Sequence, residues 1–129
     1  MFTLEQIRTA HAKVKSGADF PAYIRELKEL GVTHYETYVA DGHTDYQGNS
    51  DSRMTSPTKY IALIISNNIN AEQFKKDLLH HQQGGSDYLQ FCRQCADNGI
   101  EKWAVSLQMM TCTYFDKAGA EVLVENIPQ

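Results

Sequence analysis

The chain has 129 residues, with 12 Lys or Arg against 16 Asp or Glu, for a formal net charge of −4. This length favours a single domain over residues 1–129, and the acidic balance excludes the basic footprint of a nucleic-acid-binding protein. The longest apolar run, residues 61–65 (Ile-Ala-Leu-Ile-Ile), is much shorter than the roughly 20 residues that cross a membrane. Residues 1–6 lack the cationic and apolar segments of a signal peptide. We therefore expect no nucleic-acid and no membrane partner.

The N-terminal segment predicts two helices. Thr3 and Gln6 have the spacing of a capping box, which predicts a helix that ends at residues 16–17. A second helix is expected to begin after Asp19, its N-cap, and to end at Gly31.

The next segment predicts strands. Residues 32–40 alternate in polarity as a strand does, and the Asp-Gly pair at 41–42 predicts a hairpin turn into a partner strand through Tyr46. The polar residues 48–57 are expected to form an exposed loop. The isoleucine-rich residues 59–66 are expected to form a buried strand.

The second half of the chain predicts the same kinds of element again. Asn70 and Asp87 are expected to cap two helices, which end at residues 84–85 and 98–99. Three strands are then expected, over residues 102–107, 111–115 and 121–127.

The order helix, helix, strand, strand, strand therefore occurs twice, and a shift of the chain by 68 positions aligns its key residues. The aligned pairs include Asp19 with Asp87, Gly31 with Gly99, Tyr35 with Trp103, and Tyr46 with Tyr114. Caps, stops and core aromatics are the positions that a duplicated unit must keep. We predict an α+β fold of two ααβββ repeats, approximately residues 3–66 and 70–127. The repeats are expected to share one mainly antiparallel sheet, with the helices packed on one face.

The three cysteines indicate a reducing compartment. An odd number of cysteines argues against a disulfide framework, so we expect reduced thiols and a cytoplasmic location. Cys92 and Cys95 form a C-x-x-C, which could be a redox pair or half of a zinc site. The repeat aligns them with Ile24 and Leu27, which favours buried structural thiols. We therefore predict no metal site, and we identify no cofactor.

Candidate binding residues lie on the second face of the first predicted strand, near the turn that follows it, and at equivalent places in the second repeat. This face is either an ordinary solvated surface, a ligand groove or a homodimer surface. The adjacent pair His80 and His81 is expected to serve the end of its helix rather than to bind metal, because adjacent helical side chains point about 100° apart. The candidate residues are His34, Glu36, Tyr38, His43, Tyr46, Lys102 and Tyr114.

Several short strings occur in one order along the chain, and together they resemble the YbcV-like family of small bacterial or prophage proteins. Members of this domain-of-unknown-function family are often labelled "phage envelope protein". The resemblance implies an α+β domain of bacterial or prophage origin. It implies no established reaction, so no functional residue is carried over. The strings are residues 16–21 (SGADFP), 31–32 (GV) with Tyr35, 74–75 (FK) and 81–84 (HQQG), 87–88 (DY) with 91–92 (FC), 99–103 (GIEKW), 110–114 (MTCTY), and 123–125 (LVE) with 127–128 (IP).

Three functions are consistent with the sequence. The leading hypothesis is a non-catalytic cytoplasmic binding or interaction module, which takes a small molecule or protein on the open sheet face or between the repeats. One alternative is a small enzyme with acid–base groups among His34, Glu36, His43 and Tyr46. The other alternative is a phage structural protein, as the family label suggests.

Overall fold

The computed structural model describes residues 2–15 and 17–127 of the chain. Its helices are α1 (Leu4–His11), α2 (Phe20–Leu30), α3 (Ala71–Gln82) and α4 (Tyr88–Asp97), with short 3-10 helices η1 (Gly17–Asp19) and η2 (Asn49–Asp51). Its strands are β1 (Val32–Tyr38), β2 (Thr44–Gly48), β3 (Arg53–Thr55), β4 (Ile100–Ser106), β5 (Thr111–Asp116) and β6 (Glu121–Asn126).

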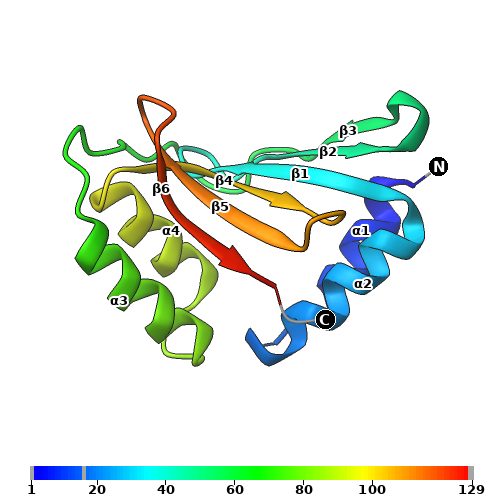
Figure 1. Ribbon diagram of the computed structural model, residues 1–129, viewed down its shortest axis with the longest axis horizontal. Coiled ribbons are helices and arrows are strands. Elements are labelled where there is room, and N and C mark those ends of the chain that lie inside the picture. The colour runs from blue at the N-terminus through cyan, green and yellow to red at the C-terminus, as the bar shows by residue number, and fades with distance from the viewer. Residues whose placement is uncertain (1, 16, 128–129) are drawn as a thin grey trace.

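The six strands form one sheet in the order β3-β2-β1-β4-β5-β6, and every neighbouring pair is antiparallel. Helices α1 and α2 lie beneath one half of the sheet, and α3 and α4 lie beneath the other half, so that all four pack on one face (Figure 1). The predicted α+β class, the antiparallel sheet and the placement of the helices are confirmed. No helix in the described ranges is long and apolar enough to span a membrane.

Helix α1 begins as predicted but ends early. The Thr3 hydroxyl accepts a hydrogen bond from the Gln6 amide, and the Gln6 side chain accepts one from the Thr3 amide, which completes the capping box. The helix ends at His11, because the Val14 amide turns to the His11 carbonyl at 3.0 Å in a tighter i−3 bond. The expected end at residues 16–17 is therefore wrong, and Ser16 itself lies outside the described residues.

The predicted caps of α2 and α4 differ in the hydrogen bonds that they make. Asp87 accepts a hydrogen bond from the Gln90 amide at 2.7 Å and so caps α4. Asp19 precedes α2 but makes no capping bond, because its carboxylate accepts the Lys15 amide at 2.9 Å instead. Gly31 ends α2 with a φ of +99°, as a glycine stop requires.

The two halves of the sheet correspond closely. The bounds of β4 are those of β1 moved along by 68 positions, and β3 moved by the same step falls on the start of β6. A register shift interrupts the pairing of β1 with β2 between Val32 and His34. A second shift interrupts the pairing of β4 with β5 between Ile100 and Lys102, 68 positions further along the chain. This symmetry supports the predicted repeat, while a common origin of the halves stays a prediction.

The third strand of the first half does not lie where the sequence predicts it. β3 lies inside the expected loop 48–57, and residues 59–66 form no strand. Ile61 is 92% exposed and Ile64 is 91% exposed, whereas Ile65 is 6% exposed. The segment has to cross from the β3 edge of the sheet to α3, so this connection overrides its strand propensity.

Candidate functional site

The sheet face turned away from the helices carries most of the predicted site residues. Glu36 and Tyr38 follow His34 at alternate positions of β1, and Lys102 of β4 pairs with Tyr38. His34 is exposed and the other three are half-buried. Their predicted position on the uncovered face is confirmed, while a binding role for them stays a prediction.

Three of these side chains form a closed polar network. The Tyr38 hydroxyl donates to Glu36 Oε2 at 3.0 Å, and Lys102 Nζ lies 3.3 Å from Glu36 Oε1. Burial raises the pKa of Tyr38 to about 12, with further contributions from the hydrogen bond to Glu36 and its charge. Tyr38 is therefore a neutral donor at ordinary pH. Each charge in this network already has its partner.

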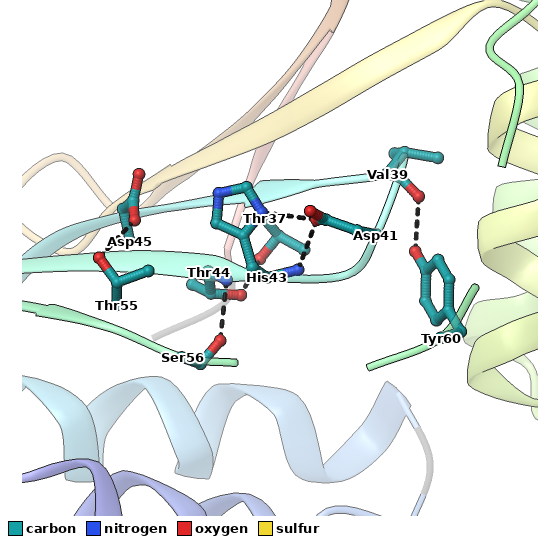
Figure 2. Close-up of polar contacts among 9 residues, drawn as sticks. All are labelled: Thr37, Val39, Asp41, His43, Thr44, Asp45, Thr55, Ser56 and Tyr60. Carbon is teal, nitrogen blue, oxygen red and sulfur yellow. Dashed lines mark hydrogen bonds and ion pairs between the residues drawn. The ribbon is translucent and has the colours of Figure 1, made fainter. Parts of the chain in front are cut away.

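His43 and Asp41 form a second pair at the turn of the hairpin (Figure 2). Asp41 Oδ1 accepts the His43 amide at 3.0 Å and lies 2.5 Å from His43 Nδ1. Burial acts to raise the pKa of the Asp41 carboxyl, but the hydrogen bonds from His43 outweigh it and lower the pKa. The His43 ring also stacks on Tyr38 with centroids 4.5 Å apart. A carboxylate that accepts an amide two residues ahead stabilises a turn, which accounts for this pair.

Tyr46 and Tyr114 do not share the open face. Tyr46 pairs with Tyr35 across β1 and β2, and Tyr114 pairs with Trp103 across β4 and β5. Residues directly opposite each other point to the same side of a sheet, and all four are buried beneath the helices. The expectation that these two tyrosines join the open-face residues is wrong, because the register of each hairpin turns them inward.

The covered face holds a different group of polar side chains, which we call the tyrosine cluster: Tyr23 of α2, Tyr35 of β1, Tyr46 of β2 and Tyr88 of α4. The rings of Tyr35 and Tyr46 are 5.6 Å apart. The Tyr88 ring meets Trp103 edge-on at 6.4 Å. Because α2 and α4 lie beneath different halves of the sheet (Figure 1), the members of the cluster come from both halves of the molecule.

The hydroxyls of the cluster lie close enough to influence one another. Burial raises the pKa of the Tyr35 phenol well above its usual value, and the Tyr23 phenol raises it further. Burial likewise raises the pKa of Tyr88, with a smaller contribution from Tyr46 of the other half. All four phenols therefore remain neutral and can donate hydrogen bonds.

The Tyr35 hydroxyl is the most informative atom of the cluster. Tyr35 is 6% exposed, and its hydroxyl has no hydrogen-bond partner among the described residues. In that part of the chain, Gln94 Oε1 is the one side-chain polar atom that is both sealed from water and unpartnered. Burial keeps this phenol protonated, so its hydroxyl is available as a donor to water or to a ligand.

Two basic side chains border the cluster. Lys59 Nζ lies over the Tyr88 ring, 5.3 Å from its centroid, and the His11 ring meets Tyr23 edge-on at 5.2 Å. Burial lowers the pKa of both basic groups, and the repulsion of Lys59 lowers that of His11 further. Both side chains keep contact with solvent. None of the ion pairs within the described residues involves either of them.

The cysteines are buried free thiols, as predicted. Cys92 and Cys95 are fully buried, and so are Ile24 and Leu27, the residues that the repeat aligns with them. Burial raises the pKa of both thiols, which disfavours the thiolate form.

His81 is half-buried and packs against α4. Its ring stacks on Phe91 with centroids 4.4 Å apart, and Nδ1 lies 3.0 Å from the Ser86 carbonyl oxygen. These contacts give His81 a structural role. Over residues 2–15 and 17–127, no group of three or more His, Cys, Asp or Glu side chains is arranged to hold a metal ion.

The sequence predicts Tyr23, Tyr35 and Tyr88 only as core aromatics, and it predicts Lys59 only as the first residue of a strand. The sequence does contain an indication of a polar site, because these positions carry tyrosine. Phenylalanine would bury the same ring without a hydroxyl. A polar group in a core needs a partner, so tyrosines at several core positions indicate a polar site. No sequence pattern marks Lys59, since its position depends on the path of the linker.

The geometry defines a class of protein: an α+β fold in which two helix pairs cover one face of a single antiparallel sheet, with a polar aromatic cluster between them. Residues 8–126 match the family described as protein of unknown function (DUF1398), and the chain belongs to this family. Among curated proteins, none matches the chain.

Proposed function

We propose that this protein is a non-catalytic binding module that holds a small molecule between its two helix pairs, at the tyrosine cluster. The observation that carries the proposal is the Tyr35 side chain, which is 6% exposed and whose hydroxyl has no hydrogen-bond partner among the described residues. Small-molecule sites combine aromatic walls with a few well-placed polar groups, and the cluster supplies both. A ligand that accepts a hydrogen bond from Tyr35 would supply this hydroxyl with a partner.

The open face supports this role less well. Glu36 is already bonded to Tyr38 and lies beside Lys102, and His43 is held by Asp41. A ligand there would have to replace contacts that already exist. Two hollows of about 330 and 360 Å³ lie elsewhere, one at the β2–β3 turn and one at the outer side of α1 and α2.

Within the DUF1398 family, we propose that the chain is of the YbcV-like type, of bacterial or prophage origin, and that it acts in the cytoplasm. The strings shared with that type, such as residues 99–103 (GIEKW), support the first statement. Three reduced and buried cysteines support a cytoplasmic location, because such thiols are typical of reducing compartments. We also propose that the two halves arose by duplication, which their matching strand bounds support.

The test of the binding proposal is a small-molecule screen by thermal shift, followed by titration of the compounds that raise the melting temperature. Trp103, the single tryptophan, contacts Tyr88 and so reports binding at the cluster through its emission. Tyr35→Phe removes one hydroxyl, and we expect it to weaken binding about 2- to 10-fold, the worth of one hydrogen bond. Tyr38→Phe makes the same change on the open face. If Tyr38→Phe weakens binding and Tyr35→Phe does not, the ligand lies on the open face.

The stability of Tyr35→Phe gives an independent measurement. Since the hydroxyl bonds to no described protein group, its removal should leave the free energy of unfolding within about 0.5 kcal/mol of the parent value. Urea unfolding followed by circular dichroism measures this quantity. A loss above about 1.5 kcal/mol would show that the hydroxyl supports the fold instead.

A further inference from the structure

Strand β6 has a free edge in the part of the chain that the structure describes. It is the last strand of the sheet, and β5 is its only neighbour there (Figure 1). The Ile127 amide donates to the Met110 carbonyl at 2.8 Å, on the side of β5. Backbone groups alternate in direction along a strand, so the amides and carbonyls of Val124 and Asn126 point away from β5. They are hydrogen-bonding groups that a further β-strand can use.

The two edges of the sheet differ in how well they resist such an addition. β3, at the opposite edge, has three residues and begins with the exposed Arg53, and short charged edge strands pair poorly. β6 has six residues, and its Val124 is 50% exposed. The register with β5 shifts between Tyr114 and Phe115, so the regular part of β6 begins at Leu123. Its following residues form the edge at which a strand can be added.

The flank of α3 beside this edge carries an exposed leucine. Gln82 Nε2 donates to Glu125 Oε1 at 3.1 Å, which places this side of α3 next to β6. Leu79 and Lys75 precede Gln82 by three and seven positions, so they share its side of the helix. Leu79 is 56% exposed and Lys75 is exposed as well. A molecule that adds a strand to β6 therefore also covers Leu79.

We infer that the chain forms a symmetric dimer in which β6 pairs antiparallel with β6 of a second copy, so that one sheet continues through both molecules. This interface is separate from the tyrosine cluster, which lies under the covered face. A second copy satisfies the edge because a two-fold axis brings identical strands together in antiparallel order. The contact is small, so we expect a reversible dimer.

The charges of the edge favour one register for this pairing. An axis at Val124 places Val124 opposite its own copy and Glu125 opposite Leu123 of the second copy. An axis at Glu125 would instead place two like charges opposite each other, which is destabilising. Lys75 adds a positive charge beside the strand that carries Glu125, so the surface is complementary to its own copy.

The test measures the dimer dissociation constant of the full chain by analytical ultracentrifugation over a series of concentrations. Val124→Lys and Val124→Glu each place two like charges at the axis, and we expect each to weaken the dimer at least about tenfold. An equal mixture of the two variants should dimerise again, because the introduced charges are then opposite. This rescue separates the loss of an interface from the loss of the fold.

Thr113→Lys is the matched control, because Thr113 lies opposite Val124 on β5 and faces the same side of the sheet, one strand away from the edge. Its charge is screened from the axis, so the dissociation constant should stay within about threefold of the parent value. A parent chain that is still monomeric at about 1 mM would overturn the inference. So would a mixture of the Val124 variants that stays monomeric, or a dimer that both variants retain. Equal weakening by Thr113→Lys and Val124→Lys would place the contact on the open face and overturn it too.

Discussion

A tyrosine in a protein core brings a hydroxyl that phenylalanine would not, and burying that hydroxyl without a partner costs free energy. Tyr60 meets this requirement, since its hydroxyl donates to the Val39 carbonyl. Tyr35 does not, although it lies at the centre of the sheet on β1. At the scale of the residue, this difference separates a side chain that supports the fold from one that is available to a ligand.

Two histidines that pack against aromatic rings, His81 and His11, are expected to make the stability of this protein depend on pH. Burial lowers the pKa of His81 below its usual value of 6.5, and it does the same for His11. The unfolded chain therefore binds more protons than the folded chain as the pH falls through 6.5, and the free energy of unfolding decreases. We expect a lower melting temperature at pH 5.5 than at pH 7.5.

The variant His81→Gln tests this assignment. Glutamine does not titrate and can still donate to the Ser86 carbonyl that His81 reaches. The loss of stability between pH 7.5 and 5.5 should therefore be smaller in this variant, and smaller again when His11→Gln is added. An unchanged loss in the double variant would mean that other groups cause the pH dependence.

At the scale of the element, the β1–β2 hairpin positions the linker as well as the open-face residues. Its inner side is held by a bond between the Thr37 and Thr44 hydroxyls at 2.8 Å, and the Thr44 amide donates to the Ser56 hydroxyl at 2.9 Å (Figure 2). Lys59 and Tyr60 then attach to the turn itself. The turn is therefore the feature that brings Lys59 to the tyrosine cluster.

Gly42 in this turn is expected to be sensitive to substitution. Its φ is +77°, and an added Cβ would lie 2.7 Å from Cε2 of Tyr60. Gly119 has a φ of +83° but open space around it, so Gly119→Ala carries only the conformational cost, about 1 kcal/mol. Gly42→Ala adds overpacking against Tyr60 and should lose about 1–3 kcal/mol more. Urea unfolding of both variants measures the difference, and equal losses would show that the Tyr60 ring moves away freely.

At the scale of the whole molecule, the centre of the sheet is built by both halves. β1 and β4 pair in antiparallel register from His34 with Ser106 to Tyr38 with Lys102. The tyrosine cluster crosses the same boundary beneath them. Units of about 60 residues bury little apolar surface and are only marginally stable alone, so the shared sheet is expected to stabilise both halves.

We therefore expect the chain to unfold in one cooperative transition. Far-ultraviolet circular dichroism reports all helices, and Trp103 emission reports β4 at the centre of the sheet. The two urea transitions should coincide, as they do for a two-state domain. Separate midpoints would mean that one helix pair detaches before the sheet is lost, and would contradict the single domain expected over residues 1–129.

The local features of this fold could be predicted from the sequence because neighbouring residues produce them. Thr3 and Asn70 cap helices through amides three residues ahead, and Gly31 ends a helix through its own backbone angle. The alternation that places Glu36 and Tyr38 on the open face is also a property of adjacent positions.

Features that depend on distant segments were decided only by the tertiary structure. Strand pairing turned Tyr46 inward opposite Tyr35, and the route of the linker left residues 59–66 without a strand partner. The meeting of Lys59 with Tyr88 depends on both the hairpin and the helix pairs. The sequence by itself determined the order of the elements, their caps and the α+β class, since these are short-range. Register and chain path determined the site, because they bring together groups that no local pattern connects.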